Sequence, residues 1–117
     1  MRLNEIDYGK ARPIDGYGPG FFRVGGEVVH GPCLVTADSV EPWTGFDDRQ
    51  ALLDLAGQVD VIFIGMGADI AHAPADLVTE LRAAGLGVET MSSPSACRTF
   101  NVLLSEARRV AAALLPV

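Results

Sequence analysis

The pattern of apolar and polar residues in the second half of the chain predicts a strand, a helix and a second strand. Residues Val59 to Ile64 are a nearly unbroken run of β-branched and aromatic side chains, which is typical of a strand buried on both faces of a parallel sheet. Pro74 then opens a helix that Gly85 ends. Leu86 to Met91 is the next predicted strand. Because such a β-α-β unit is almost always right-handed, the sheet should be at least partly parallel.

The first part of the chain predicts short strands and turns. Met1 to Asp15 is predicted as a short strand or arm, and the residues from Asp15 to Gly20 have the composition of a turn. Phe21 to Val24 and Glu27 to Val29 form a predicted β-hairpin, because the intervening Gly25-Gly26 accepts the positive φ angles of a tight primed turn.

A further strand and a helix are predicted between the hairpin and the buried run. Pro32 to Thr36 is the strand. The helix begins near Asp47 or Asp48, either of which can cap it, and it stops at Gly57. Its apolar side consists of Ala51, Leu52 and Leu55.

The last predicted helix starts at Ser93-Pro94 and continues almost to the end of the chain. A serine caps the free N–H groups, and proline fits the first helical position. On a helical wheel the apolar residues lie within a stripe of roughly 120°, with the polar residues opposite. The stripe consists of Ala96, Phe100, Leu103, Leu104, Ala107, Val110, Ala111 and Leu114, and the polar side of Arg98, Ser105, Arg108 and Arg109. Arg108 and Arg109 should favour the negative end of the helix dipole.

Together these elements predict an α/β fold, organised as a single compact layered domain over residues 1–117. A central mixed sheet contains the parallel β-α-β unit of the carboxyl-terminal half, and a β-hairpin region precedes it. The length of 117 residues and a composition of 49% hydrophobic and 21% charged residues are ordinary for one globular domain.

Charge and hydropathy exclude several classes of function. A net charge of −6 argues against a nucleic-acid or anionic-membrane surface, since both require clustered lysine and arginine. No run approaches the roughly 20 apolar residues of a membrane span, and the amino terminus has no secretory signal, so we expect a cytoplasmic protein without membrane insertion. Cys33 and Cys97 lack a C-x-x-C spacing, and we expect free, mostly buried thiols.

Several short motifs resemble a known family. They are Gly65-Met66-Gly67, Gly85 to Met91, Ala96 to Asn101, Glu106 to Arg108 and Ala112 to Pro116. With them the chain resembles the bacterial branch of a domain family of unknown function, whose eukaryotic relative is a mitochondrial assembly factor for respiratory complex I. The resemblance implies a layered α/β fold with a central mixed sheet, and an accessory role for at least one branch.

Three residues depart from the pattern of this family. Met66 stands where threonine is expected, Phe100 where tyrosine is common, and Ala107 where glycine is common. The motifs identify the family and are not catalytic signatures.

Gly65-x-Gly67 after a strand suggests dinucleotide binding, with Glu89 at the end of the next strand as the ribose ligand. However, position 70 is isoleucine where the third glycine would stand, the helix begins only near Pro74, and 117 residues leave no room for a second nucleotide-binding half. We therefore interpret the glycines as a tight turn and close packing, and expect no cofactor.

Cys97 in the first turn of the last helix is a conceivable nucleophile, because helix N-termini lower the pKa of thiols. It would need His30 or His72 as a base, and the sequence does not show whether they converge. We favour a small buried residue. Two histidines with separated carboxylates do not make a metal site, so none is predicted.

Arg98 is unusual because a cation in the first helical turn faces the positive end of the helix dipole. Together with neighbouring serines and free backbone N–H groups, it would suit a carboxylate or phosphate. The alternative is an arginine paired with Asp69, Glu89 or another acid, or a solvated one. The candidate anion site comprises Gly65, Gly67, Ser92, Ser93, Cys97, Arg98, Thr99 and Asn101.

Two functional hypotheses remain. The preferred one is a non-enzymatic accessory or interaction domain with protein partners, which assists assembly of a respiratory or other complex. The alternative is a small-anion or small-ligand binding protein or enzyme, with its site where the central strands end and the last helix begins. The sequence leans against catalysis and leaves a homo-oligomer open.

Overall fold

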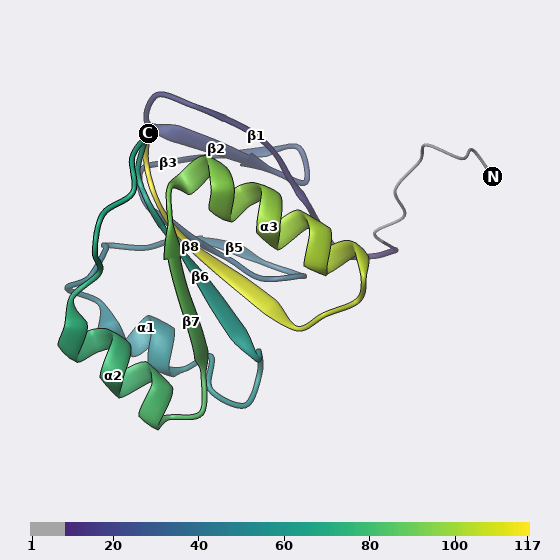
Figure 1. Ribbon diagram of the computed structural model, residues 1–117. Helices are drawn as coiled ribbons and strands as arrows, with labels where there is room; N and C mark the ends of the chain where they lie inside the picture. Colours follow the sequence, from purple (N-terminus) through teal and green to yellow (C-terminus); the bar gives the residue numbers. More distant parts are fainter. Residues whose placement is uncertain (1–8) are drawn as a thin grey trace.

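The computed structural model describes residues 9–117, and it arranges them in layers around a mixed five-stranded sheet (Figure 1). The strand order of this sheet is β5-β4-β8-β6-β7, and a separate antiparallel sheet has the order β1-β2-β3. The elements are β1 (Ile14–Gly18), β2 (Phe21–Val24), β3 (Glu27–His30), β4 (Cys33–Val35), β5 (Val40–Pro42), α1 (Arg49–Leu53), β6 (Val61–Met66), α2 (Ala75–Ala83), β7 (Gly87–Met91), α3 (Ser93–Ser105) and β8 (Val110–Leu115).

The predicted parallel β-α-β unit is confirmed. Strands β6 and β7 pair in parallel from Val61↔Gly87 to Gly65↔Met91, and α2 connects them. Pro74 is the N-cap of α2, and Gly85 follows its end with a φ of 93°. The strand predicted from Val59 to Ile64 is observed as β6, which begins two residues later and ends two residues later, and in it Ile62, Phe63 and Ile64 are each at most 1% exposed. The apolar run therefore identified the buried strand.

The predicted hairpin is also present, whereas the turn before it is shorter than expected. Strands β2 and β3 pair antiparallel around Gly25-Gly26, whose φ angles are 55° and 85°. The turn predicted from Asp15 to Gly20 is confined to Pro19 and Gly20, because residues 14–18 form strand β1, which pairs with β2. Antiparallel pairing with β2 satisfies the backbone N–H and C=O groups of this glycine-rich segment. The composition of the segment alone did not indicate this pairing. Residues 1–8 of the predicted amino-terminal arm lie outside the described residues.

The predicted length of the last helix was wrong. Helix α3 ends at Ser105, and Val110–Leu115 forms β8, which lies between β4 and β6 in the central sheet. The helix ends in a Schellman motif, in which the Arg108 amide donates to the Leu103 carbonyl and the Ala107 amide to the Leu104 carbonyl. Ala107 has a φ of 60°, so the chain leaves the helix at that residue.

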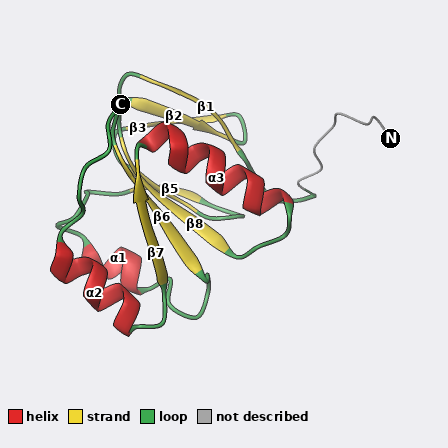
Figure 2. Cartoon of the chain, viewed as in Figure 1, coloured by secondary structure: helices red, strands yellow, loops and turns green. Residues whose placement is uncertain are grey.

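Strand β8 places small apolar residues against both faces of the sheet. One face carries α3 and the three-stranded sheet, and the other carries α1 and α2, as Figure 2 shows. Ala112 and Leu114 belong to the core on the α3 side, while Ala111 and Ala113 belong to the core on the α1 and α2 side. All four side chains are 0% exposed. Because both faces of this segment are buried, residues whose pattern is compatible with a helix form a strand instead.

The helix predicted from Asp47 or Asp48 to Gly57 is present as the shorter α1, which Asp48 caps and which ends at Leu53. The Asp48 carboxylate accepts a hydrogen bond from the Ala51 amide at 3.2 Å. Leu52 is fully buried beneath it. Across residues 9–117, no helix combines the length and apolar character that crossing a membrane would require.

Candidate functional site at the start of the last helix

The candidate site lies where the carboxyl ends of β6 and β7 meet the first turn of α3 (Figure 1). Its central side chain is Ser93, which is 0% exposed. The Ser93 hydroxyl accepts from the Gly67 amide at 2.9 Å and donates to the Leu115 carbonyl at 2.6 Å. The Ser93 amide donates to the Gly67 carbonyl at 2.7 Å. Ser93 therefore links α3 to the ends of β6 and β8.

The two candidate glycines allow this close approach. A Cβ on Gly65 would lie 2.7 Å from the Ser93 Oγ, 2.8 Å from the Ser93 Cα and 2.9 Å from the Leu114 Cδ2. Real Cβ atoms do not approach other atoms so closely, so a side chain at position 65 would displace the helix from the sheet. Gly67 has a φ of 94°, which favours glycine. The structure thus gives both glycines roles in packing and turning.

Ser92, one residue earlier than the predicted cap, is the N-cap of α3. Its hydroxyl oxygen accepts from the Ser95 amide at 3.4 Å and donates to the Ser95 hydroxyl at 3.1 Å. Ser93, which the sequence assigned to capping, instead occupies the first helical position. The cap therefore leaves the Ser93 hydroxyl free to bond within the core.

Arg98 is exposed and is the sixth residue of α3, so it lies in the second turn and not in the first turn, where the sequence placed it. Its guanidinium donates to the Ser95 hydroxyl at 3.3 Å. Within the described part of the chain it forms no ion pair with Asp69, Glu89 or any other carboxylate. Because the effect of the helix dipole falls off within the first turn, residues 93–96, the position of Arg98 is less unfavourable than the sequence indicated.

Cys97 is buried, and burial raises the pKa of its thiol to about 12. Cys33 lies in the same core, and burial also raises the pKa of its thiol to about 12. At neutral pH both side chains are thiols rather than thiolates, so they lack the nucleophilic form.

The remaining candidates, Thr99 and Asn101, form contacts with neighbouring elements. The Thr99 hydroxyl donates to the Met91 Sδ at 3.7 Å. The Asn101 amide donates to the Ile14 carbonyl at 2.8 Å, and its oxygen accepts from the Ile14 amide at 2.8 Å. Asn101 thus binds the edge strand β1 to α3, a role that its position in the sequence did not indicate.

The two histidines have different surroundings. The His30 ring on β3 lies 6.3 Å from the Phe21 ring, and His72 follows the β6 end in the loop before α2. Both are exposed. Over residues 9–117, no group of three or more histidine, cysteine or acidic side chains could hold a metal ion. The anion-binding role of the candidate residues stays a prediction.

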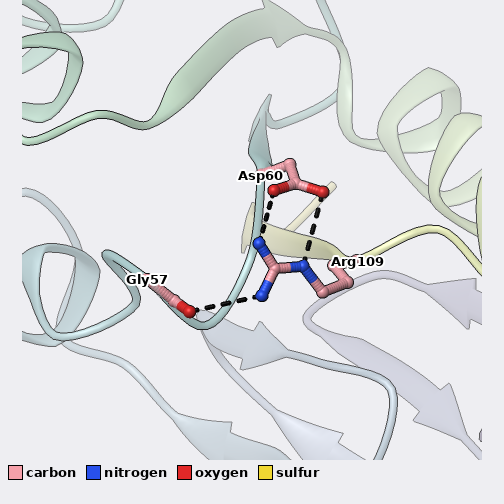
Figure 3. A network of polar contacts seen from close by, with 3 residues as sticks. All are labelled: Gly57, Asp60 and Arg109. Carbon is pink, nitrogen blue, oxygen red and sulfur yellow. Dashed lines mark hydrogen bonds and ion pairs between the residues drawn. The ribbon is translucent and has the colours of Figure 1, made fainter.

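Sequence reasoning missed the opposite end of α3. Because it extended the helix, it placed Arg109 on a helical surface, whereas Arg109 begins the approach to β8. Its guanidinium binds both carboxylate oxygens of Asp60, at 2.7 and 3.5 Å, and the Gly57 carbonyl at 3.3 Å (Figure 3). The hydrogen bond from Arg109 lowers the pKa of Asp60. The departure at Ala107, where glycine is common in the similar family, was the available signal for a helix end.

A cavity of about 650 Å³ lies beside this ion pair. It opens where β6 and β8 begin and α3 ends, and its lining includes Val59, Leu104, Arg108 and Val110. No motif in the sequence drew attention to these residues, because they come from separate elements.

Comparisons with known proteins find relatives that match most of this chain. It is 58% identical to an uncharacterized protein of Rhodobacter capsulatus over 117 residues, which are 100% of this chain and 94% of the relative. It is 34% identical to the NADH dehydrogenase [ubiquinone] 1 alpha subcomplex assembly factor 3 of Danio rerio, over 88% of this chain and 63% of that protein. For the factor of the same name from Homo sapiens, identity is 30% over 99% of this chain and 67% of the relative.

Solved structures share the fold. A Bartonella henselae protein described as an outer membrane protein matches with a TM-score of 0.80 and 35% identity, over 92% of this chain and 95% of the other. A Mth938-like domain from Bordetella pertussis matches with a TM-score of 0.79 and 25% identity, over 99% and 92% of the two chains. The family described as protein of unknown function (DUF498/DUF598) matches residues 14–115. The chain therefore belongs to the DUF498/DUF598 family of proteins of unknown function.

Proposed function

We propose that this chain is a non-enzymatic accessory domain that binds a protein partner and assists assembly of a respiratory complex. The observation that carries the proposal is its similarity to vertebrate proteins named as assembly factors, which extends over 88% of this chain in the zebrafish protein. This chain spans 63% of the length of that relative.

The chemistry of the candidate site supports binding rather than covalent catalysis. The hydroxyl of Ser93 is engaged by two backbone groups, and the thiol of Cys97 is protonated at neutral pH. Both residues therefore serve the packing of α3, and a partner would have to use other surfaces.

The loop between β6 and α2 offers such a surface. Ile70 is 80% exposed at its tip, and the neighbouring residues Ala68 and Ala71 are also exposed. An exposed branched apolar side chain is costly to hydrate. Burial of this side chain by a partner therefore contributes favourably to the free energy of binding. Strand β7 lies at the edge of the central sheet, and within residues 9–117 one side of its backbone is unpaired with another strand.

The proposal is tested by deleting the gene in its source organism. We expect less fully assembled NADH:ubiquinone oxidoreductase on native gels, and restoration by the wild-type chain. Ile70→Asp should fail to restore assembly, because the substitution removes exposed apolar surface without disturbing the core. Val102→Asp is the matched control, since Val102 is 57% exposed on α3 and should restore assembly. Unchanged levels of the complex in the deletion strain would overturn the proposal.

A further inference from the structure

The cavity at the carboxyl-terminal end of α3 is apolar inside. Its volume of about 650 Å³ lies in the range of pockets that hold small molecules. The apolar lining comes from four separate segments and includes Ala11, Ala37, Val59, Leu104 and Val110. Because α3 has 13 residues, this cavity lies on the order of 20 Å from the start of the helix and is a separate feature from the candidate site.

Two cations stand at the rim of this cavity. Lys10 and Arg108 both line it and are exposed, and among the described residues neither side chain makes a hydrogen bond or an ion pair. Arg109 also lines the cavity, but its guanidinium is bound to Asp60. The acidic side chain of the lining is Asp38, whose carboxylate accepts a hydrogen bond from the Thr36 hydroxyl. The rim is therefore positive on a chain whose net charge is −6.

Arg108, one of these cations, directly follows a residue with a strained backbone conformation. Ala107 lines the cavity and, over residues 9–117, is the one non-glycine residue with a positive φ. The left-handed conformation costs an L-residue roughly 1–2 kcal/mol, and such strain gathers at functional sites. The turn at Ala107 directs the chain so that Arg108 reaches the rim.

We propose that this cavity binds a small monocarboxylate with an apolar chain. The alkyl chain would lie against Ala37, Leu104 and Val110, where it displaces water from apolar surface. The carboxylate would lie at the rim, where a guanidinium can donate two parallel hydrogen bonds to it. Arg108 is the main recognition residue, and Lys10 adds charge.

Binding is tested with hexanoate, octanoate and decanoate below their micelle concentrations, followed by amide chemical shifts of the full-length chain. We expect shifts at Ala37 and at residues 107–110. Each added methylene should tighten binding about four-fold, since a buried methylene contributes about 0.8 kcal/mol and about 1.4 kcal/mol is ten-fold. No saturable shift with decanoate, or shifts centred on Ile70 and Val102, would overturn the proposal.

Two comparisons separate recognition of the carboxylate from general apolar adhesion. Octylammonium and 1-octanol contain eight carbons, as octanoate does, and both should bind at least ten-fold more weakly. Arg108→Gln should weaken octanoate binding about ten-fold or more, because a hydrogen bond to a charged group is lost. Arg23→Gln, at an exposed arginine on β2 that does not line the cavity, should leave the affinity unchanged. Equal binding of the three octyl compounds, or equal loss in both variants, would contradict the assignment.

Discussion

At the start of α3, one buried hydroxyl fixes the distance between a helix and a sheet. The Ser93 Oγ lies between the Gly67 amide and the Leu115 carbonyl, and both groups are thereby satisfied without water. Leaving either of them unpaired in the interior would cost about 1–3 kcal/mol. The absence of a side chain at Gly65 is what allows the serine to reach them.

Gly65→Ala is therefore expected to destabilise the fold by about 1–3 kcal/mol, through overpacking of a well-filled interior. Urea denaturation monitored by Trp43 fluorescence measures this change. Gly16→Ala is the matched control, because a Cβ there meets nothing within 4 Å and the backbone has no positive φ. We expect the control to change the free energy of unfolding by less than about 0.5 kcal/mol. Equal stability of the two variants would show that α3 can move aside.

Among the elements, α3 and β8 show how a single residue divides a helix from a strand. The Schellman motif satisfies the carbonyls of Leu103 and Leu104 and turns the chain at Ala107. Five residues later, at Ala112, the chain is in the middle of the sheet, paired with β4 on one side and β6 on the other. The ion pair between Arg109 and Asp60 holds the starts of β8 and β6 together at the surface.

Ala107→Gly should stabilise the protein by about 0.5–1 kcal/mol, because glycine adopts the left-handed conformation without the steric penalty of a Cβ. The measurement is the shift of the urea midpoint at constant slope. Ala83→Gly in α2 is the control, since Ala83 is exposed and helical, and glycine there should cost up to about 1 kcal/mol. A loss of stability at both positions would mean that the turn at Ala107 carries no strain.

Across the whole molecule, the central sheet separates two apolar cores. Cys33 and Cys97 lie in the core shared by α3 and the three-stranded sheet, with Phe63 and Phe100. Both thiols have a pKa raised to about 12 by burial, whereas in the unfolded chain a thiol titrates near 8.5. Below pH 8.5 both states hold the proton, so the stability from burial is fully present. As pH rises from about 8.5 toward 12, the unfolded state loses protons first and the stability falls.

Stability should therefore decrease between pH 9 and pH 11 more steeply in the wild type than in Cys97→Ala. One buried thiol contributes a slope of about 1.4 kcal/mol per pH unit in this window. Urea titrations at several pH values under reducing conditions give the slope of the free energy of unfolding against pH for each protein. Groups other than Cys97 contribute equally to both slopes, so the difference between the slopes reports on Cys97. Parallel curves for the wild type and the variant would contradict the burial of Cys97.

The sequence alone determined the elements whose signals are local. The apolar run of β6, the proline and glycine that bound α2, and the Gly25-Gly26 hairpin turn each predicted the observed element, because chain stiffness and side-chain periodicity act over a few residues. The family resemblance was also carried by short motifs, and the family match over residues 14–115 confirms it.

Only the tertiary structure decided the roles of β8 and Ser93. Alanine is the strongest helix former, so Ala111 to Ala113 favoured a continued helix, and the strand forms because long-range pairing with β4 and β6 buries both faces. A serine at a helix start is compatible with capping, with anion binding or with a buried link. The choice depends on groups at Gly67 and Leu115, which are 26 and 22 residues away in sequence and meet Ser93 only when the sheet is complete.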